Sequence, residues 1–500
     1  MTSRASLLAC GALVLVALQP WARAGSDAGA IDAHLARLDG PSAERAVAEI
    51  SRAGGRVSTQ LARLAIHRGD ATTALRLLEG AAHEPKADEV RELRAVASGL
   101  LHATAGARET RTADGALFLH LQHPADAVLE PLLHETVTAA RKVTGDALGF
   151  EWKAPTYVVV VRDQQTLAEA TGLPYDAART TGTLAIAKWG RVTMLSPRAT
   201  EAPFAWRDTV VHELAHLALT AVTADRAPLW LQEGVAKDME IRWRDADPYD
   251  ERLPLASIVR AAMGTGEYVP LDKLGPSVAM LPSANAAEVA FAAATLFVRY
   301  LRAELGVDGF ARYLRLLAEA GPRDDALQRA TGRSFPAWHG AWLDLLRQGP
   351  APARARGENV RNAQDGGRRA RLARLLVDRG HGDAAVVELE RGAATAPRNF
   401  EADGGWRTLH ALAHERRGDD TALDRVLFGV LPETEPEAPW YRLRARRAEA
   451  RGELEASRRD RVRVLGREPF GPDAVCEAGR TGPEATLCRA ARARRDPGID

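Results

Sequence analysis

Two histidines, His212 and His216, are four positions apart in the sequence His-Glu-Leu-Ala-His. Apolar residues around them recur with helical spacing, so we expect a helix that carries both imidazoles on one face, about one turn apart. Two nitrogens presented in this way suit one tetrahedral metal ion. Glu213 lies beside that face, where its carboxylate would reach a metal-bound water rather than the metal. These residues predict a zinc site with a general base.

Glu233 is the candidate third ligand, seventeen residues after His216 in the segment Pro-Leu-Trp-Leu-Gln-Glu-Gly-Val-Ala. A carboxylate among apolar neighbours is costly to bury without a partner, which indicates a nearby cation. Two imidazoles and one carboxylate leave the fourth position of a zinc ion open, as in catalytic zinc sites. The alternatives are a structural pair of histidines and a glutamate that faces solvent at the start of a helix.

The segment from His212 to His216, followed by P-x-W-L-x-E-G-x-A, resembles the peptidase MA-like metallopeptidases. These are bacterial gluzincins in which the active-site arrangement of thermolysin is found on a short domain. The resemblance implies that His212, His216 and Glu233 bind zinc. It implies that Glu213 is the general base, which takes a proton from the zinc-bound water and passes it to the leaving amine.

Two positions depart from the family pattern. Phe291 stands where these enzymes often have a tyrosine, so the residue that stabilises the oxyanion is unassigned. Thermolysin has an acid four residues after its glutamate ligand to orient a histidine, whereas this chain has Lys237 there. Asp238 and Glu240 are the nearby substitutes, and only Glu240 shares a helical face with Glu233.

The region around these residues, 107–347, is predicted to be an α+β domain in which a small sheet precedes a helical lobe. Strands are expected at 116–122 and 156–162, with an amphipathic helix at 129–148 between them. A hairpin is expected to end at Leu195 and to turn at Trp189-Gly190. The resemblance implies a thermolysin-like zincin fold, in which this hairpin supplies the edge strand that pairs with an extended substrate.

Helical patterns flank this domain, at residues 25–106 and, beyond a linker at 348–365, at 366–500. The later segment has glycines at 380, 418 and 452, which are 38 and 34 positions apart, and each precedes an Ala-rich helix. Both segments resemble tetratricopeptide repeats, whose stacked hairpins bind protein partners. An ordinary helical bundle is the alternative.

The first 24 residues have the pattern of a signal peptide. Arg4 precedes an apolar run from Leu7 to Leu18, and Ala22-Arg23-Ala24 offers a cleavage site. We therefore expect export, to the periplasm or as a secreted protein. A lipid anchor is not expected because the apolar run lies after Cys10 rather than before it.

Composition and cysteine content restrict the partners. Lys plus Arg is 67 and Asp plus Glu is 66, so no net field would attract nucleic acid. No later segment reaches eighteen apolar residues, so we expect no membrane span after the signal peptide is removed. Cys476 and Cys488 are predicted to form one disulfide, with two unpaired thiols as the alternative.

Two further histidine pairs are interpreted as structural. His410 and His414 also lie four positions apart, but no glutamate stands between them and their segment is repeat-like. His120 and His123 lie at the end of a predicted strand without an acidic partner.

The sequence therefore predicts an exported zinc metallopeptidase that acts on a protein or peptide substrate, with repeats that recruit a protein partner. Two alternatives stay open. One is an envelope scaffold that acts through its repeats and retains a weak or inactive peptidase domain. The other is a zinc hydrolase of a non-peptide amide, which would use the same ligands in a different pocket.

Overall fold

The structure is a computed structural model, and it describes most of the chain. The described residues are 31, 33–53, 57–80, 87–200, 203–245, 250, 255–275, 277–278, 281–319, 325–349, 360–395, 403–432 and 434–470. The predicted signal peptide, Cys476 and Cys488 lie outside them. By its internal contacts the chain divides into two compact units, residues 1–246 with 255–351 and residues 247–254 with 352–500.

The helices at the start of the first unit include α2 (Gly40–Arg52), α3 (Ser58–His67), α4 (Ala71–Gly80) and α5 (Ala87–Thr104). α3 and α4 form a hairpin around Gly69, which takes a left-handed conformation with φ 82° at the turn. Apolar residues from α3, α4 and α5 share one buried core, including Ile66, Leu78 and Leu93.

A mixed five-stranded sheet follows, in the order β1-β2-β3-β5-β4. Its strands are β1 (Arg108–Arg111), β2 (Leu117–Leu121), β3 (Thr156–Val161), β4 (Ala185–Lys188) and β5 (Arg191–Leu195). β2, β3 and β5 are parallel, whereas β1 and β4 pair antiparallel at the two edges. The continuous valine run of β3 suits its central place, because a central parallel strand is covered on both faces.

The helices α5 and α7 (Gln164–Thr171) cover one face of this sheet. Val159 and Val161 of β3 pack with Ala103 of α5 and Leu167 of α7. A Cβ on Gly99 would lie 2.2 Å from the backbone of Glu169, so α5 and α7 cross in close contact. The N-terminal helices therefore share a core with the sheet, and contacts do not separate residues 31–104 as a domain of their own.

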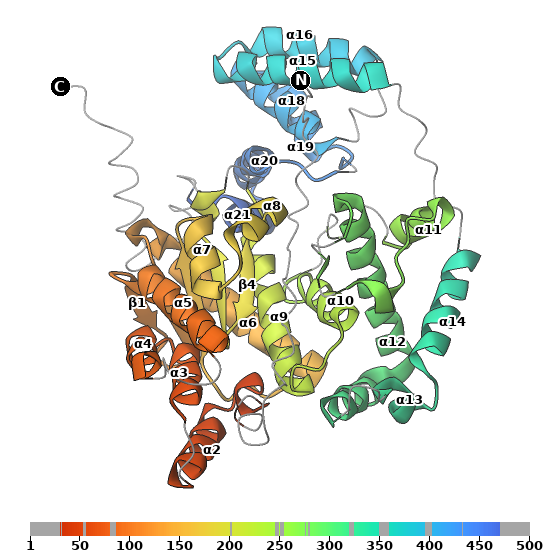
Figure 1. Cartoon of the computed structure of the whole chain (residues 1–500). Coiled ribbons are helices and arrows are strands. Elements are labelled where there is room, and N and C mark those ends of the chain that lie inside the picture. Colours follow the sequence, from red (N-terminus) through yellow and green to blue (C-terminus); the bar gives the residue numbers. More distant parts are fainter. Residues whose placement is uncertain are drawn as a thin grey trace, which may run out of the picture. The chain divides into compact units, whose positions relative to one another are not determined.

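Helices α6 (Glu130–Leu148) and α9 (Trp206–Thr223) also contact the sheet, α6 at β2 and α9 at β4 and β5 (Figure 1). A helical lobe then follows, with α10 (Leu229–Met239), α11 (Leu255–Thr265), α12 (Ala284–Glu319), α13 (Ala326–Thr331) and α14 (Phe335–Gln348). α12 is broken at Gly306, where φ is 66°. Short 3-10 helices also lie in the described part of the unit, among them η1 (Pro124–Leu129), η2 (Pro197–Ala199) and η3 (Leu271–Lys273).

The described residues of the second unit contain three helix pairs: α15 (Val360–Asp378) with α16 (Gly382–Thr395), α18 (Gly404–Arg417) with α19 (Asp420–Phe428), and α20 (Ala438–Ala450) with α21 (Leu454–Arg467). Gly380, Gly418 and Gly452 turn these pairs with φ of 82°, 71° and 79°. The predicted hairpins are thus confirmed at their turns. Their membership of the tetratricopeptide family stays a prediction.

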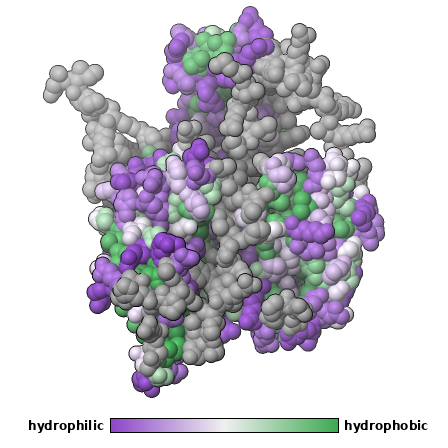
Figure 2. Space-filling model, in the orientation of Figure 1, coloured by the Kyte–Doolittle hydropathy of each residue, from purple (hydrophilic) through white to green (hydrophobic). Residues whose placement is uncertain are grey.

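The fold as a whole is mostly helical with one small mixed sheet, which agrees with the predicted α+β class. A thermolysin-like arrangement and the predicted domain boundaries stay predictions. Prediction missed β1, α7 and α8 (Tyr175–Thr181), which are short. No described helix combines the length and the apolar character needed to cross a membrane. On the face shown in Figure 2, hydrophobic residues are interspersed with hydrophilic ones.

Candidate metal centre

Helix α9 carries the histidine motif through the interior of the first unit. Its sequence is apolar on almost every side, which is typical of a helix buried all round. The helix contacts both β4 and α10 (Figure 1). The side chains of His212 and Glu213 are 0% exposed and that of His216 is 1% exposed. Polar groups at this depth need partners, and α10 supplies them.

The structure brings Glu233 of α10 to the histidine pair. Nε2 of His212 lies 3.0 Å from Nε2 of His216. Oε2 of Glu233 lies 3.7 Å from the first nitrogen and 3.9 Å from the second. Among the described residues, these three form the one group of three or more histidine, cysteine or acidic side chains with ligand atoms all within 4.8 Å of one another.

Each imidazole uses its Nδ1 for a hydrogen bond to a side-chain oxygen. Nδ1 of His212 is 2.6 Å from Oε1 of Glu240, and Nδ1 of His216 is 3.0 Å from Oε1 of Gln232. Because these oxygens accept, the hydrogen-bond network assigns the proton of each ring to Nδ1. Both Nε2 atoms then present lone pairs to each other, and lone pairs this close repel unless a cation lies between them.

The donor set fits a zinc ion. At zinc–ligand distances of about 2.0–2.2 Å, two donors on a tetrahedral ion lie roughly 3.4 Å apart, and the three observed separations fall on either side of that value. Both oxygens of Glu233 are buried and make no hydrogen bond. A carboxylate in this state needs a cation as its partner.

Burial shifts the pKa values of these ligands toward their neutral forms. Burial, aided by the neighbouring His212, lowers the pKa of His216 to about 3. Burial also lowers the pKa of His212, although its hydrogen bond to Glu240 opposes this. Burial raises the pKa of Glu233 to about 8, against the attraction of Lys237. The imidazoles are therefore ready to bind a metal, whereas Glu233 must release a proton.

Three successive turns of α9 are linked to α10 and the segment after it. Asp208, His212 and His216 are spaced by four and share one face of α9. Asp208 accepts hydrogen bonds from Trp243 Nε1 at 2.9 Å and from Arg244, whose Nη2 lies 3.0 Å from its Oδ2. On the next two turns of α9, His212 is hydrogen-bonded to Glu240 and His216 to Gln232. These contacts fix the distance between the two helices at the centre.

The face of α10 next to Glu233 anchors the helix on α12. Trp230 stacks edge-on against Phe297 with ring centroids 5.1 Å apart. Gly234 meets α12 so closely that a Cβ there would lie 2.4 Å from the carbonyl oxygen of Ala294. Asp238 lies on this same face, four residues further on.

The structure corrects the expectation that Asp238 supports a zinc ligand. Its two carboxylate oxygens bind Arg299 Nε at 2.7 Å, Arg242 Nε at 2.7 Å and Arg302 Nη1 at 3.3 Å. The helical period turns Asp238 toward the arginines of α12, away from the histidines. Glu240 is the residue that contacts His212, which agrees with the helical face it shares with Glu233.

Glu213 lies beside the edge strand β4. Burial, together with the charge of Glu233, raises its pKa well above the ordinary value. The backbone N–H of Ala187 is directed at its carboxylate and favours the ionised form, although neither oxygen makes a hydrogen bond of normal geometry. A buried carboxyl with a raised pKa and no fixed partner has the character of a proton acceptor.

β4 is the last strand of the sheet on this side, and its residues Ala185 and Ala187 are each 1% exposed. Leu195 N–H donates to Leu184 O, so the alternation of an antiparallel pair gives Ile186 and Lys188 the remaining bonds to β5. The main-chain groups of Ala185 and Ala187 are then directed outward, and β4 has no further strand beside it among the described residues.

Other residues singled out from the sequence lie outside this cluster. Phe291 lies within α12, and its ring centroid is 5.4 Å from Nζ of Lys237. His123 accepts a hydrogen bond from the N–H of Ala125 and caps η1. His120 lies 3.4 Å from Glu109 on β1.

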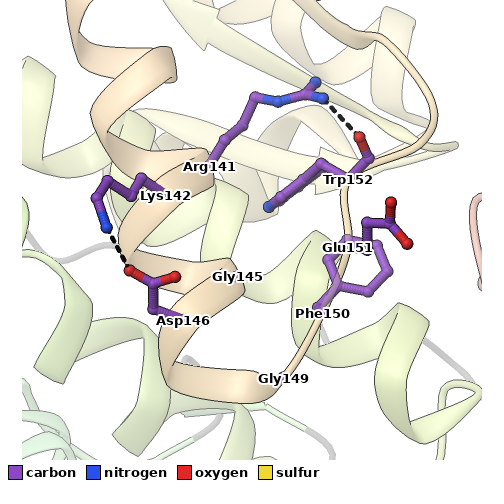
Figure 3. A pocket seen from close by; sticks show the side chains of 8 residues that line it. All are labelled: Arg141, Lys142, Gly145, Asp146, Gly149, Phe150, Glu151 and Trp152. Carbon is purple, nitrogen blue, oxygen red and sulfur yellow. Dashed lines mark hydrogen bonds and ion pairs between the residues drawn. The ribbon is translucent and has the colours of Figure 1, made fainter.

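A surface depression at the end of α6 is separate from the centre (Figure 3). Arg141 donates there to the carbonyl oxygen of Trp152 at 2.9 Å, and also to Ala154 O, to Thr156 Oγ1 on β3 and to Ala116 O just before β2. Lys142 pairs with Asp146 at 2.6 Å. These contacts stabilise the end of α6 and the loop that connects it to β3, and they do not surround a ligand.

Comparison with family models, with curated proteins and with solved structures finds no match to this chain. Its site is therefore interpreted from its own geometry. Sequence analysis missed Gln232 and the contact of Asp208 with Trp243 and Arg244. One feature of the sequence could have indicated Gln232: it is a polar residue next to the proposed ligand Glu233 within an apolar segment.

Proposed function

We propose that this chain is a zinc-dependent peptidase in which His212, His216 and Glu233 hold the metal. One observation carries the proposal. Two imidazoles donate their Nδ1 protons to Glu240 and Gln232, and their Nε2 lone pairs converge near a buried carboxylate that has no hydrogen-bond partner. A divalent cation is the partner that satisfies all three donors at once.

The remaining residues have defined roles in hydrolysis. A zinc ion held there would polarise a carbonyl and acidify a water molecule. Glu213 follows His212 directly and is proposed as the general base. Its carboxylate takes the proton from the attacking water and returns it to the leaving amine, for which its raised pKa is suitable.

The place of β4 at the edge of the sheet supports a peptide as the substrate. When the chain opens transiently and uncovers this edge, an extended peptide backbone could pair by strand addition with the main-chain groups of Ala185 and the carbonyl of Ala187, whose N–H is directed at Glu213. This pairing would place a peptide bond near Glu213, because Ala187 lies beside that carboxylate. Export of the protein, and recruitment of a protein partner by the helix pairs of the second unit, belong to the same proposal.

The test combines metal content with peptide cleavage. We expect the purified chain to bind zinc stoichiometrically and to cleave members of a broad peptide library. Glu213→Gln should retain zinc and lose about 10²- to 10⁴-fold in rate, the usual contribution of a general base. Glu151→Gln, an exposed change of the same kind, should retain both.

Other outcomes would select the alternatives. A zinc-loaded protein that cleaves no peptide would favour a scaffold that acts through its helix pairs. Cleavage restricted to non-peptide amides would favour the other hydrolase. A protein that binds no zinc would overturn the proposal.

A further inference from the structure

We propose that Lys237 is a positioning residue of the metal centre, which holds Glu240 against His212 through an ion pair. The inference rests on the proposed zinc site. It assigns a role to the residue at which this chain departs from thermolysin.

The contacts form a continuous series from Lys237 to the ligand. Nζ of Lys237 lies 2.9 Å from Oε1 and 3.1 Å from Oε2 of Glu240. The same Oε1 is 2.6 Å from Nδ1 of His212. The side chains of Lys237 and Glu240 are 24% and 15% exposed, so solvent screens this pair less than a surface pair.

The acidic surroundings explain why a cation is needed. The charge of Glu240 acts on three other carboxyl groups close by, those of Asp208, Glu213 and Glu233. Wherever these groups are ionised, their repulsion favours turning Glu240 outward to solvent, and a neighbouring cation offsets that repulsion. Lys237 stands one turn after Glu233 and one turn before Glu240, so the helix presents it between the two acids.

Phe291 holds the lysine in this position. Its ring centroid is 5.4 Å from Nζ, which is within the range of a cation–π contact. The two departures from the family pattern, Lys237 and Phe291, therefore contact each other and act together on Glu240.

A double-mutant cycle on zinc affinity tests the role. Dissociation constants would be measured by competition with a chelator for the full chain, Lys237→Met, Glu240→Gln and the double variant. Each single change should weaken zinc binding by about 10- to 100-fold, the usual effect of losing a partner of a ligand. The double variant should bind no more weakly than Glu240→Gln alone, because Lys237 acts through Glu240.

Two controls accompany the cycle. Lys142→Met also removes an ion-paired lysine of the first unit, from an exposed pair with Asp146, and should leave zinc affinity unchanged. Lys237→Arg should restore most of the affinity. Thermal unfolding of each metal-free variant would show whether it is folded.

Several results would overturn the inference. One is a Lys237→Met variant that binds zinc as tightly as the unaltered chain or more tightly. Another is a double variant whose loss in binding free energy equals the sum of the losses of the two single variants. Failure of the proposed function would give a different result. The unaltered chain would then contain no zinc or cleave no peptide, whereas this inference fails only if the zinc affinities of the variants do not follow the expected pattern.

Discussion

The histidine pair of α9 and the histidine pair of α18 have the same spacing in different surroundings. In α9 the ring centroids of His212 and His216 lie 4.7 Å apart, and each Nδ1 has an oxygen partner. In α18 the ring centroids of His410 and His414 lie 5.9 Å apart, and Nδ1 of His414 is buried without a hydrogen-bond partner. The α18 pair also belongs to no potential metal cluster among the described residues.

Spacing along one helix therefore sets only the face that the imidazoles share. One turn before His212 stands Asp208, which ties α9 to the segment after α10. One turn before His410 stands Trp406, which packs against the His410 ring with centroids 6.1 Å apart. A metal site thus needs a second helix that brings acceptors for Nδ1 and a carboxylate for the ion.

The largest effect is expected from removing the third ligand. Glu233→Ala should abolish stoichiometric zinc binding, because two imidazoles alone give a weak site. His414→Ala should leave the zinc content unchanged. Metal analysis after dialysis would measure both variants. Loss of zinc from His414→Ala would break the comparison, since it would show that α18 also takes part in metal binding.

A smaller effect is expected from moving the ligand without removing it. Gly234→Ala would force α10 away from α12, because the added Cβ would lie 2.4 Å from the carbonyl oxygen of Ala294. We expect a loss of about 1–3 kcal/mol in the free energy of unfolding, as in other overpacked cores, together with weaker zinc binding. Denaturant unfolding would measure the loss.

Gly340→Ala on α14 is the matched control, because a Cβ there would meet nothing within 4 Å. It should be neutral or slightly stabilising. If Gly234→Ala behaved in the same way, α10 would not be fixed by its packing on α12.

The smallest effect is expected from pH on the metal-free protein. The folded protein keeps the proton of Glu233 up to its pKa of about 8, whereas the unfolded chain loses it near the ordinary value of 4.5. Stability should therefore fall as pH rises between about 6.5 and 8, by roughly 1 kcal/mol per pH unit. The raised pKa of Glu213 acts in the same direction.

His212, His216 and His410 contribute little in that window, because their lowered pKa values keep them neutral when folded and the ordinary value of 6.5 makes them increasingly neutral when unfolded. Their contribution to stability is lost only as pH falls below 6.5. Denaturant unfolding at several pH values would measure the slope. Glu233→Gln should reduce it, and an unchanged slope in that variant would contradict the assignment.

The sequence predicts the parts of the centre that follow from helical periodicity. His212, His216 and Glu213 lie in one apolar periodic segment, and the relation of Glu240 to Glu233 follows from a spacing of seven on one helix. The strands β2 and β3 were predicted nearly to their bounds, because their apolar runs are clear.

The remaining contacts depend on which helices lie side by side, and no local pattern encodes that. The hydrogen bond from Arg244 to Asp208 joins residues 36 positions apart, and Asp238 turns to α12 because its arginines lie there. α7 and α8 were missed because helices this short depend on tertiary packing for their stability.

The burial of the centre has a kinetic consequence. The side chains that would hold the metal and accept the proton are at most 1% exposed in the folded chain. Neither a chelator nor the carbonyl of a substrate reaches them unless the surrounding chain opens transiently. Metal exchange and substrate binding would then depend on the same opening motion. A substitution that makes a chelator remove the ion faster should therefore also make the peptide bind faster.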